Sequence, residues 1–343
     1  MATLKDVAAK ANVDVSTVSR ALNNTSYVHP ETKARIIAAA KDLGYRPNTA
    51  TRSLRRGRRK IIGYVVPRTH VALFSEILRG VDSKARELGY SVMICITDDN
   101  PQKEEACLNQ LREGNVDGII LTPTGKNTRL IRDIHACGIA IVQIIRRQDH
   151  LLSSIVADNE SCGYESVKYL YNLGSRTIGL INGSNLLAPY AERYIGYRRA
   201  LEEFHLQEIV AASEKPTNSF SFGYECATRL LKNYPSLDAI MAAVDIQGLG
   251  VIRAVKDFGK KIPDDIKVMS MTGHTIGKML ETTMTSMEIP ASEMGSAAVD
   301  MLIAEIEAPS EDKPRACHKL FRTSLTERES TVCSHASGNV HSD

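Results

Sequence analysis

Short apolar runs of strand type alternate with longer helical patterns over most of the chain, and this alternation restricts the fold more than any other feature. The strand-like runs lie at 61–67, 90–97, 117–123, 139–145, 177–183, 237–244 and 266–272. The helical patterns lie at Ser75–Leu88, Pro101–Glu113, Arg129–Cys137, Asn159–Leu173, Ala191–Phe204, Gly223–Asn233 and Gln247–Phe258. Such alternation predicts doubly wound parallel sheets, in two halves that meet near Asp158. Ligands of these folds bind at the carboxyl ends of the strands, here in the cleft between the halves.

The first sixty residues follow a different pattern, with short helices and tight turns. Two helical patterns flank a turn at Asn12-Val13-Asp14 within the segment Thr3–Asn24. Thr3 and Asp6 can form a capping box at the first helix, and Asp14 can cap the second. The inward residues are expected to be Leu4, Val7, Ala8, Ala11, Val18, Ala21 and Leu22. The second helix leaves Ser16, Thr17, Ser19 and Arg20 on its free face. This is the layout of a helix-turn-helix whose second helix lies in the DNA major groove.

A third helix is expected from Pro30 to about Leu43, and Gly44 should end it. Its inward residues are predicted to be Ala34, Ile37, Ala38 and Leu43. Pro47 interrupts the following segment. Asn48 can then cap a short helix from Thr49 to Arg55, which Gly57 ends.

The modest net charge of +3 conceals an uneven distribution. Residues 1–60 hold 13 Lys/Arg and 4 Asp/Glu, a charge of +9, whereas the remainder holds 30 and 36, a charge of −6. A basic head on a mildly acidic body is typical of a protein that binds nucleic acid through that head.

Several classes of protein are disfavoured. No apolar run approaches the roughly 20 residues of a membrane span. The N-terminus, MATLKDVAAK, is charged and amphipathic, unlike a signal peptide, so we expect a cytoplasmic, nucleoid-associated protein. The seven cysteines are scattered and form no C-x-x-C pair, which favours free buried thiols over disulfides or a zinc site. We expect no metal, no cofactor and no catalytic site, because PTGKNT at 123–128 lacks the glycine spacing of a P-loop and no other enzyme motif is present.

Three segments together resemble one known family: TLKDVAAKANVDVSTVSRALNN, the following VHPETKARIIAAAKDLGYRPN, and TRSL. They are similar to the LacI/GalR family of bacterial repressors, and the resemblance runs from residue 3 to about 329. It implies an all-α helix-turn-helix head (1–46), a hinge helix with a basic linker (47–60) and a periplasmic-binding-protein-like α/β core of two doubly wound subdomains (61–329). The first subdomain would span about 61–158 and 290–320, and the second about 159–287 and 321–329. The tail, 330–343, has no periodicity and is expected to be disordered.

The resemblance also implies which residues of the head contact a double-stranded operator. Val15, Ser16 and Arg20 occupy the positions that read bases, and Arg20 can make a bidentate contact to guanine. Thr17 and Asn23 match positions that touch phosphates. The DNA-contacting set is completed by Thr3, Asn48, Thr49 and Arg55.

Leu54 is predicted to be a wedge, since it lies in a short polar helix with no partner to bury it. In the family, the hinge helices of two subunits enter the minor groove, where such a leucine opens a central base step. The alternative is an ordinary packing contact. The run RRGRRK at 55–60 could add phosphate contacts and steepen the salt dependence of DNA binding, or could be a solvated linker.

The effector cleft departs from the family pattern. Arg193 matches an arginine that grips a ligand, Asp158 a pocket-edge acid, and Arg146 half of an acid–arginine pair whose acid is replaced by Ile145. Asp245 and Thr272 follow two later strands, and Thr272 stands where an aspartate usually holds sugar hydroxyls. A cleft that keeps arginines but loses acids favours an anion, such as a sugar phosphate or a carboxylate; His274 could assist. The alternatives are an unusual neutral sugar held by Phe74, Thr122 and Asn182, or control by a partner protein.

The conclusion from sequence is a homodimeric repressor with a small-molecule effector and no membrane partner. Two other classes compete with it. An enzyme is disfavoured by the missing motifs, and an exported solute-binding protein by the basic helix-turn-helix. Whether the effector weakens or strengthens DNA binding is left open.

Overall fold

The computed structural model describes residues 2–23, 26–45, 59–114, 116–213, 219–273, 275–309 and 315–332. The chain divides into two compact units, Met1–Arg59 and Lys60–Asp343. The predicted hinge residues Asn48, Thr49, Leu54 and Arg55 lie outside the described residues.

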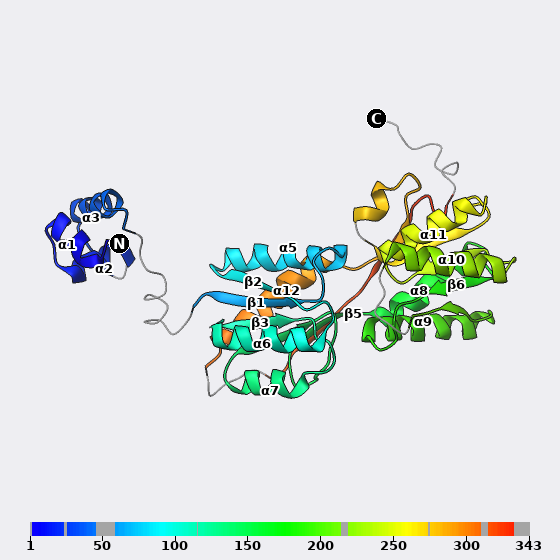
Figure 1. Cartoon of the computed structure of the whole chain (residues 1–343), viewed down its shortest axis with the longest axis horizontal. Coiled ribbons are helices and arrows are strands. Elements are labelled where there is room, and N and C mark those ends of the chain that lie inside the picture. The colour runs from blue at the N-terminus through cyan, green and yellow to red at the C-terminus, as the bar shows by residue number, and fades with distance from the viewer. Residues whose placement is uncertain are drawn as a thin grey trace. The chain divides into compact units, whose positions relative to one another are not determined.

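The described residues of the first unit form three short helices, α1 (Leu4–Ala11), α2 (Val15–Asn23) and α3 (Pro30–Asp42) (Figure 1). The capping box is confirmed: the Thr3 N–H donates to Asp6 Oδ2 at 2.7 Å and the Asp6 N–H donates to Thr3 Oγ1 at 3.4 Å. The hydrogen bond that the Thr3 N–H donates lowers the pKa of the Asp6 carboxyl. Asn12, with φ +51°, ends α1 in the left-handed region and makes the predicted turn. The buried residues of α1 and α2 are those predicted, with Leu4 and Leu22 at the edge of the core.

The predicted inward face of α3 is wrong. Ala34, Ile37 and Ala38 are exposed, whereas Ile36, Ala39 and Ala40 are buried and Leu43 packs beside them. The true stripe is therefore turned by one residue, or about 100°. Adjacent Ile36 and Ile37 give the helix two possible apolar stripes, and only packing against α1 and α2 selects one.

The second unit contains two six-stranded sheets. The first has the order β11-β5-β4-β3-β1-β2, and each of its pairs is parallel. Its strands are β1 (Ile61–Val66), β2 (Ser91–Ile96), β3 (Gly118–Leu121), β4 (Ala140–Ile144), β5 (Ser154–Ala157) and β11 (His318–Phe321). Helices α5 (Ala72–Glu87) and α12 (Ala291–Glu307) pack on one face, and α6 (Pro101–Gly114) and α7 (Thr128–Ala136) on the other. Helices on both faces explain why β3 and β4 are buried along their whole length.

The second sheet repeats this topology, with the order β12-β10-β9-β8-β6-β7. Its strands are β6 (Ile178–Ile181), β7 (Ile209–Ala211), β8 (Ala239–Ala242), β9 (Lys267–Gly273), β10 (Thr285–Glu288) and β12 (Ser324–Thr326). Helices α8 (Asn159–Asn172) and α9 (Ala188–Phe204) cover one face, and α10 (Phe220–Asn233) and α11 (Asp245–Asp257) the other. A short 3-10 helix, η1 (Thr275–Met279), follows β9. The predicted doubly wound α/β core is confirmed, except that β12 runs antiparallel to β10.

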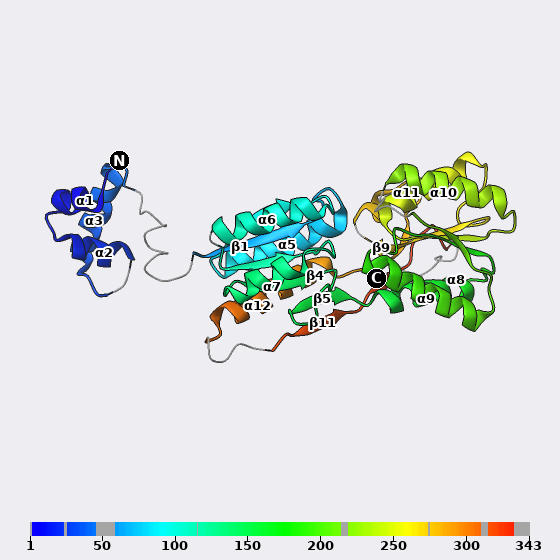
Figure 2. The ribbon, with the colours of Figure 1, turned by 60° about the horizontal axis from the view of Figure 1, so that its bottom comes forward.

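The chain passes between the two sheets more than once. Figure 2 shows one result of this path, the late strand β11 beside β5 in the first sheet. After β10 in the second sheet it returns as α12 to the first, and after β11 it enters the second again as β12. The strands β5, β7, β10, β11 and β12 and the helix α12 were not predicted as elements. Both β11 and β12 are short and largely exposed, so neither carries the apolar run on which strand prediction depends.

The expected disordered tail begins too early. Ser330 and Thr331 are buried, and Ser330 Oγ donates to the Val268 carbonyl at 2.6 Å. The Thr285 N–H donates to Ser330 Oγ at 2.8 Å, which ties this segment to β10. The core therefore continues to at least Val332, and residues 333–343 lie outside the described ranges.

Helices α8 and α9 touch backbone to backbone through two glycines. A Cβ atom at Gly163 would lie 2.1 Å from the Arg193 carbonyl oxygen, and one at Gly196 would lie 1.9 Å from that of Glu160. Such close approach requires glycine. It also fixes the spacing of the two helices that bring Asn159 and Arg193 to the cleft.

Two further observations concern the described residues only. None of their helices is long and apolar enough to cross a membrane. Their six cysteines are free thiols, but Cys137 and Cys317 are exposed, which corrects the expectation that the thiols are buried.

Candidate functional site

The free face of α2 presents an arginine that is already oriented. Arg20 Nε donates to the Ser16 carbonyl at 3.3 Å, and one terminal nitrogen donates to Ser16 Oγ at 3.3 Å and to Thr17 Oγ1 at 3.4 Å. Val15, at the start of the helix, is 40% exposed although it is apolar. Val18 and Ala21 face inward, so the residues predicted to read bases share the outward face. A short helix with this face matches a recognition helix.

Two other predicted contact residues lie at the ends of the first two helices. Thr3 caps α1, and Asn23 ends α2, where its side chain donates to the Ser19 carbonyl at 2.8 Å. In the basic linker, Lys60 belongs to the core: its N–H donates to Asp117 Oδ2 at 2.7 Å and its ammonium lies 4.0 Å from the centre of the Tyr90 ring. These two contacts hold Lys60 against the core and make its ammonium less available to a phosphate.

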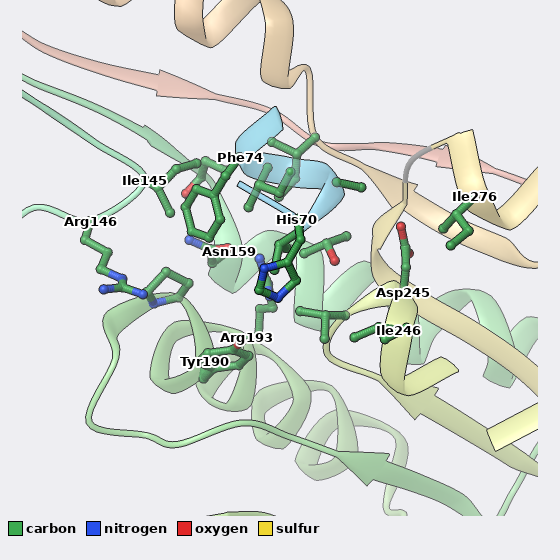
Figure 3. A pocket seen from close by; sticks show the side chains of 18 residues that line it. His70, Phe74, Ile145, Arg146, Asn159, Tyr190, Arg193, Asp245, Ile246 and Ile276 are labelled. Carbon is green, nitrogen blue, oxygen red and sulfur yellow. The ribbon is translucent and has the colours of Figure 1, made fainter. Parts of the chain in front are cut away.

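A cavity of about 170 Å³ lies between the two sheets, where their strands end (Figure 3). Both sheets change strand order at this edge, between β1 and β3 and between β6 and β8, as expected for a ligand site in this kind of fold. The lining is His70, Val71, Ala72, Leu73, Phe74, Ile145, Arg146, Ala157, Asn159, Pro189, Tyr190, Arg193, Val244, Asp245, Ile246, Thr272, Ile276 and Ile289. Twelve of these eighteen residues are apolar or aromatic, so the cavity is mostly a hydrocarbon surface with a few polar groups.

Arg193 is the polar centre of this cavity. It rises from α9 between the side chains of the two halves (Figure 3) and is only 3% exposed. One terminal nitrogen donates to the Ala243 carbonyl at 3.1 Å, and its Nε has no hydrogen-bond partner in the described part of the chain. Arg193 forms no salt bridge with any described residue. A buried guanidinium in this state is suited to an anionic ligand.

Arg146 has a partner that sequence reasoning missed. Its guanidinium donates to Asp99 Oδ1 at 2.5 Å and to the Pro123 carbonyl at 3.2 Å. Asp99 also accepts from Arg68 at 2.7 Å and is only 4% exposed. The expectation of two uncompensated arginines therefore holds for Arg193 alone. Asp99 could not be predicted, because it follows β2 and lies 47 residues from Arg146 in the sequence.

Three predicted site residues do line the cavity beside the arginines: Phe74, Asp245 and Thr272. Asp245 Oδ1 accepts from Ser270 Oγ at 2.6 Å, which fixes its carboxylate at the start of α11. Asn159 was not predicted. Its amide donates to the Ala157 carbonyl at 3.1 Å and to Glu192 Oε2 at 2.9 Å, while its Oδ1 is buried without a described partner.

Three other predicted residues do not line the cavity. Asp158 caps α8, accepting from the Ser161 N–H at 3.1 Å, and the neighbouring Asn159 takes its place in the lining. Thr122 is completely buried behind β3. Asn182 donates to Asn185 and to the Tyr190 carbonyl, so it supports the wall instead of facing a ligand. The alternative of a neutral sugar held by Phe74, Thr122 and Asn182 therefore loses two of its three residues. His274 lies outside the described residues.

Ile145 has the most unusual backbone of the lining. Its φ is +69°, in the left-handed region that β-branched residues almost never adopt. Such a conformation costs about 1–3 kcal/mol and persists where the surroundings impose it, most often at functional sites. Ile145 follows β4, its N–H donates to the Ile155 carbonyl at 2.8 Å, and its side chain is 7% exposed beside Phe74 (Figure 3).

The PTGKNT segment is a fixed loop. The buried Glu104 accepts from the Thr124 N–H at 2.7 Å, from Thr124 Oγ1 at 2.8 Å and from the Asn127 amide at 2.9 Å. The Glu104 carboxylate, which lies on α6 and binds this loop, would repel a phosphate, in agreement with the failed P-loop spacing. Among the described residues, no group of three or more His, Cys, Asp or Glu side chains could hold a metal ion.

Comparison with known proteins identifies the family. Residues 3–48 match the family model for bacterial regulatory proteins of the lacI family. Residues 59–323 match the model for periplasmic binding proteins and the sugar binding domain of the LacI family. The ribose operon repressor of Halalkalibacterium halodurans is 30% identical over 99% of this chain and 100% of its own.

Two solved structures are similar over nearly the whole length. The transcriptional regulator CelR–cellobiose complex is 26% identical, with a TM-score of 0.71, over 96% of this chain and 100% of that one. The lac repressor dimer bound to operator and the anti-inducer ONPF is 23% identical, with a TM-score of 0.85, over 97% and 99%, and it supports the fold alone. The relatives are regulators and not enzymes. The chain belongs to the LacI family of bacterial transcriptional regulators.

Proposed function

We propose that this chain is a homodimeric repressor that binds a near-palindromic operator through α2 and the hinge segment, and releases or tightens on it when a small anion fills the cleft. The observation that carries the DNA half is the orientation of Arg20 by Ser16 and Thr17 on the free face of α2. A two-fold dimer sets the spacing of its two recognition helices, so the operator should mirror that symmetry. Such a protein would act in the bacterial cytoplasm, on the nucleoid.

The effector half of the proposal is supported by the position of the cavity. It touches loops of both sheets, and the chain passes between these sheets at several points, so a ligand that closes the cleft would change the angle between the halves. In the proposed mechanism, the hinge segment changes its conformation together with the angle between the two halves. The sign of control depends on which arrangement the effector binds more tightly.

A gel shift of the full chain with its own upstream intergenic DNA tests the proposal. Specific retardation that survives competitor DNA is expected. A solute-binding protein, which shares the core fold, would show no specific retardation with or without added small anions, and that result would overturn the proposal.

Arg20→Lys should weaken specific operator binding by about 1–3 kcal/mol per recognition helix, because lysine keeps the charge but loses the bidentate contact to guanine. Binding to nonspecific DNA should hardly change. Fluorescence anisotropy at fixed salt, with operator and scrambled duplexes, measures both. Arg35→Lys, on α3, is the matched control and should leave operator affinity unchanged. Equal losses on both duplexes would show that Arg20 only contacts phosphate.

Arg58→Gln with Arg59→Gln should make operator binding less sensitive to salt. Each lost phosphate contact reduces the slope of log K against log salt by roughly 0.9. Lys60→Gln should change the slope less, because the Lys60 ammonium lies on the Tyr90 ring. An unchanged slope in the double variant would assign the basic run to a solvated linker.

A further inference from the structure

The side chains that line the cavity restrict the chemical class of the effector more than the charge of the cavity alone does. This inference rests on the proposed function, since it concerns the ligand of the same cleft. Arg146, Arg193 and Asp245 are the lining residues with a full charge, apart from any proton on His70. Asp99 compensates Arg146, which leaves Arg193 for the ligand. One guanidinium without a carboxylate partner among the described residues, in a cavity that also holds the Asp245 carboxylate, suits a monoanion better than a phosphate dianion.

The buried atoms without partners show where the polar end of the ligand lies. Arg193 Nε, a donor, and Asn159 Oδ1, an acceptor, are both buried without a hydrogen-bond partner in the described chain. Both residues are at least 97% buried, and Figure 3 shows them together at the centre of the cavity. Native proteins rarely leave such atoms unsatisfied unless a ligand or water completes them. The complementary ligand carries an acceptor anion and, next to it, a hydrogen-bond donor.

Beyond His70, Arg146, Asp245 and Thr272, the side chains that line the rest of the cavity are apolar or aromatic. Ile145, Phe74 and Ile289 form a continuous apolar cluster in the first half. Val244, Ile246 and Ile276 line the second half. A polyol placed against these apolar side chains would bury hydroxyl groups without hydrogen bonds, which costs more than leaving them in water. The strained backbone of Ile145 supports an apolar ligand, because a backbone conformation that favours asparagine, aspartate or glycine carries an apolar side chain here.

We propose that the effector is a small monocarboxylate with a hydrocarbon body and a hydrogen-bond donor, such as a 2-hydroxyl group, beside the carboxylate, and that Ile145 is the residue that excludes polyhydroxylated ligands. Arg193 binds the carboxylate and Asn159 Oδ1 accepts from the donor. Ile145 and Phe74 pack on the hydrocarbon.

A matched set of six-carbon ligands separates charge from hydroxylation. Hexanoate and gluconate are carboxylates without and with hydroxyl groups, and 1-hexanol and glucose are the corresponding uncharged compounds. Thermal shifts of the full-length protein at equal ligand concentrations should show stabilisation by hexanoate and more by 2-hydroxyhexanoate, because the hydroxyl satisfies Asn159. Gluconate, glucose and 1-hexanol should give little or none. Stabilisation by gluconate equal to that by hexanoate, equal effects of hexanoate and 1-hexanol, or no response to any carboxylate would each overturn the inference.

Two substitutions test the role of Ile145. Ile145→Asn suits the left-handed backbone and gives the wall a polar group, so it should shift the ratio of hexanoate to gluconate affinity toward gluconate by about tenfold. Ile145→Val keeps the apolar, β-branched wall and should preserve the ratio. Because the readout is a ratio within one variant, a general change in stability does not affect it. An unchanged ratio of hexanoate to gluconate affinity in Ile145→Asn would show that Ile145 does not determine ligand specificity.

A gel shift without ligand keeps the two proposals apart. Specific operator binding together with a failed hexanoate response would overturn the effector class but not the regulator. Absence of operator binding by the wild-type chain, both without ligand and with each carboxylate of the set, would overturn the proposed function itself.

Discussion

Asp99→Asn is expected to lower the free energy of unfolding by about 3–5 kcal/mol, the cost of leaving buried charge without its counter-ion. Asp99 accepts from Arg68 at 2.7 Å and from Arg146 at 2.5 Å. The three side chains are 4%, 19% and 10% exposed, so water can compensate the two guanidiniums only in part. Asparagine has the same shape and also tolerates the left-handed backbone of Asp99, where φ is +56°. The substitution therefore removes the charge and little else.

The adjacent Asp98 provides the control. It has the same left-handed backbone, with φ +53°, and also binds a cation, since Lys103 donates to it at 2.5 Å. This bond lowers the pKa of the Asp98 carboxyl, yet the side chain is 52% exposed. Solvent screens such a pair, so Asp98→Asn should hardly change stability.

Urea denaturation at one protein concentration measures both variants, because dimer stability depends on concentration. Asp99→Asn should lower the midpoint with an unchanged slope, which signifies a loss of stability and not of compactness. Similar midpoints for the two variants would show that the buried network contributes no more than a surface ion pair. In that case Arg146 could no longer be treated as neutralised, and the cleft would suit a ligand of higher charge.

The Asp99 network also shows where sequence reasoning reached its limit. The two sheets and the outward face of α2 followed from periodic patterns, because apolar spacing dictates which face of an element is buried. The family followed from the resemblance of the quoted motifs. Arg193 followed from the resemblance. The partner of Arg146 could not follow from either, since Asp99 lies in the loop after β2 and meets Arg146 only through the arrangement of the strands in the sheet.

Other errors have local physical causes. Two adjacent isoleucines in α3 allow two apolar stripes, and the pattern could not choose between them. Asp158 and Asn159 are adjacent in the sequence, and the exact residue at which α8 begins decides which of them faces the cavity and which caps the helix. The backbone of Ile145 gave no signal at all, because strain of this kind comes from the surrounding fold and not from the residue itself.

Gly163→Ala is the second substitution with a large expected effect. The new Cβ atom would lie 2.1 Å from the Arg193 carbonyl oxygen, far closer than van der Waals contact allows. A backbone carbonyl in a helix cannot turn aside as a side chain can, so α8 and α9 must move apart. We expect a loss of about 3 kcal/mol, at the upper end of the usual range for overpacking. Alanine is otherwise the better helix former, which makes the sign of this prediction informative.

Gly114→Ala is the matched control, because Gly114 is also helical and a Cβ atom there would meet nothing within 4 Å. Helix propensity alone should then leave the melting temperature unchanged or raise it. Because α8 carries Asn159 and α9 carries Arg193, Gly163→Ala should also weaken the stabilisation by 2-hydroxyhexanoate, whereas Gly114→Ala should not. If Gly163→Ala kept both its melting temperature and its response to 2-hydroxyhexanoate, the spacing of the two helices would not be what places Arg193 and Asn159 for a 2-hydroxycarboxylate.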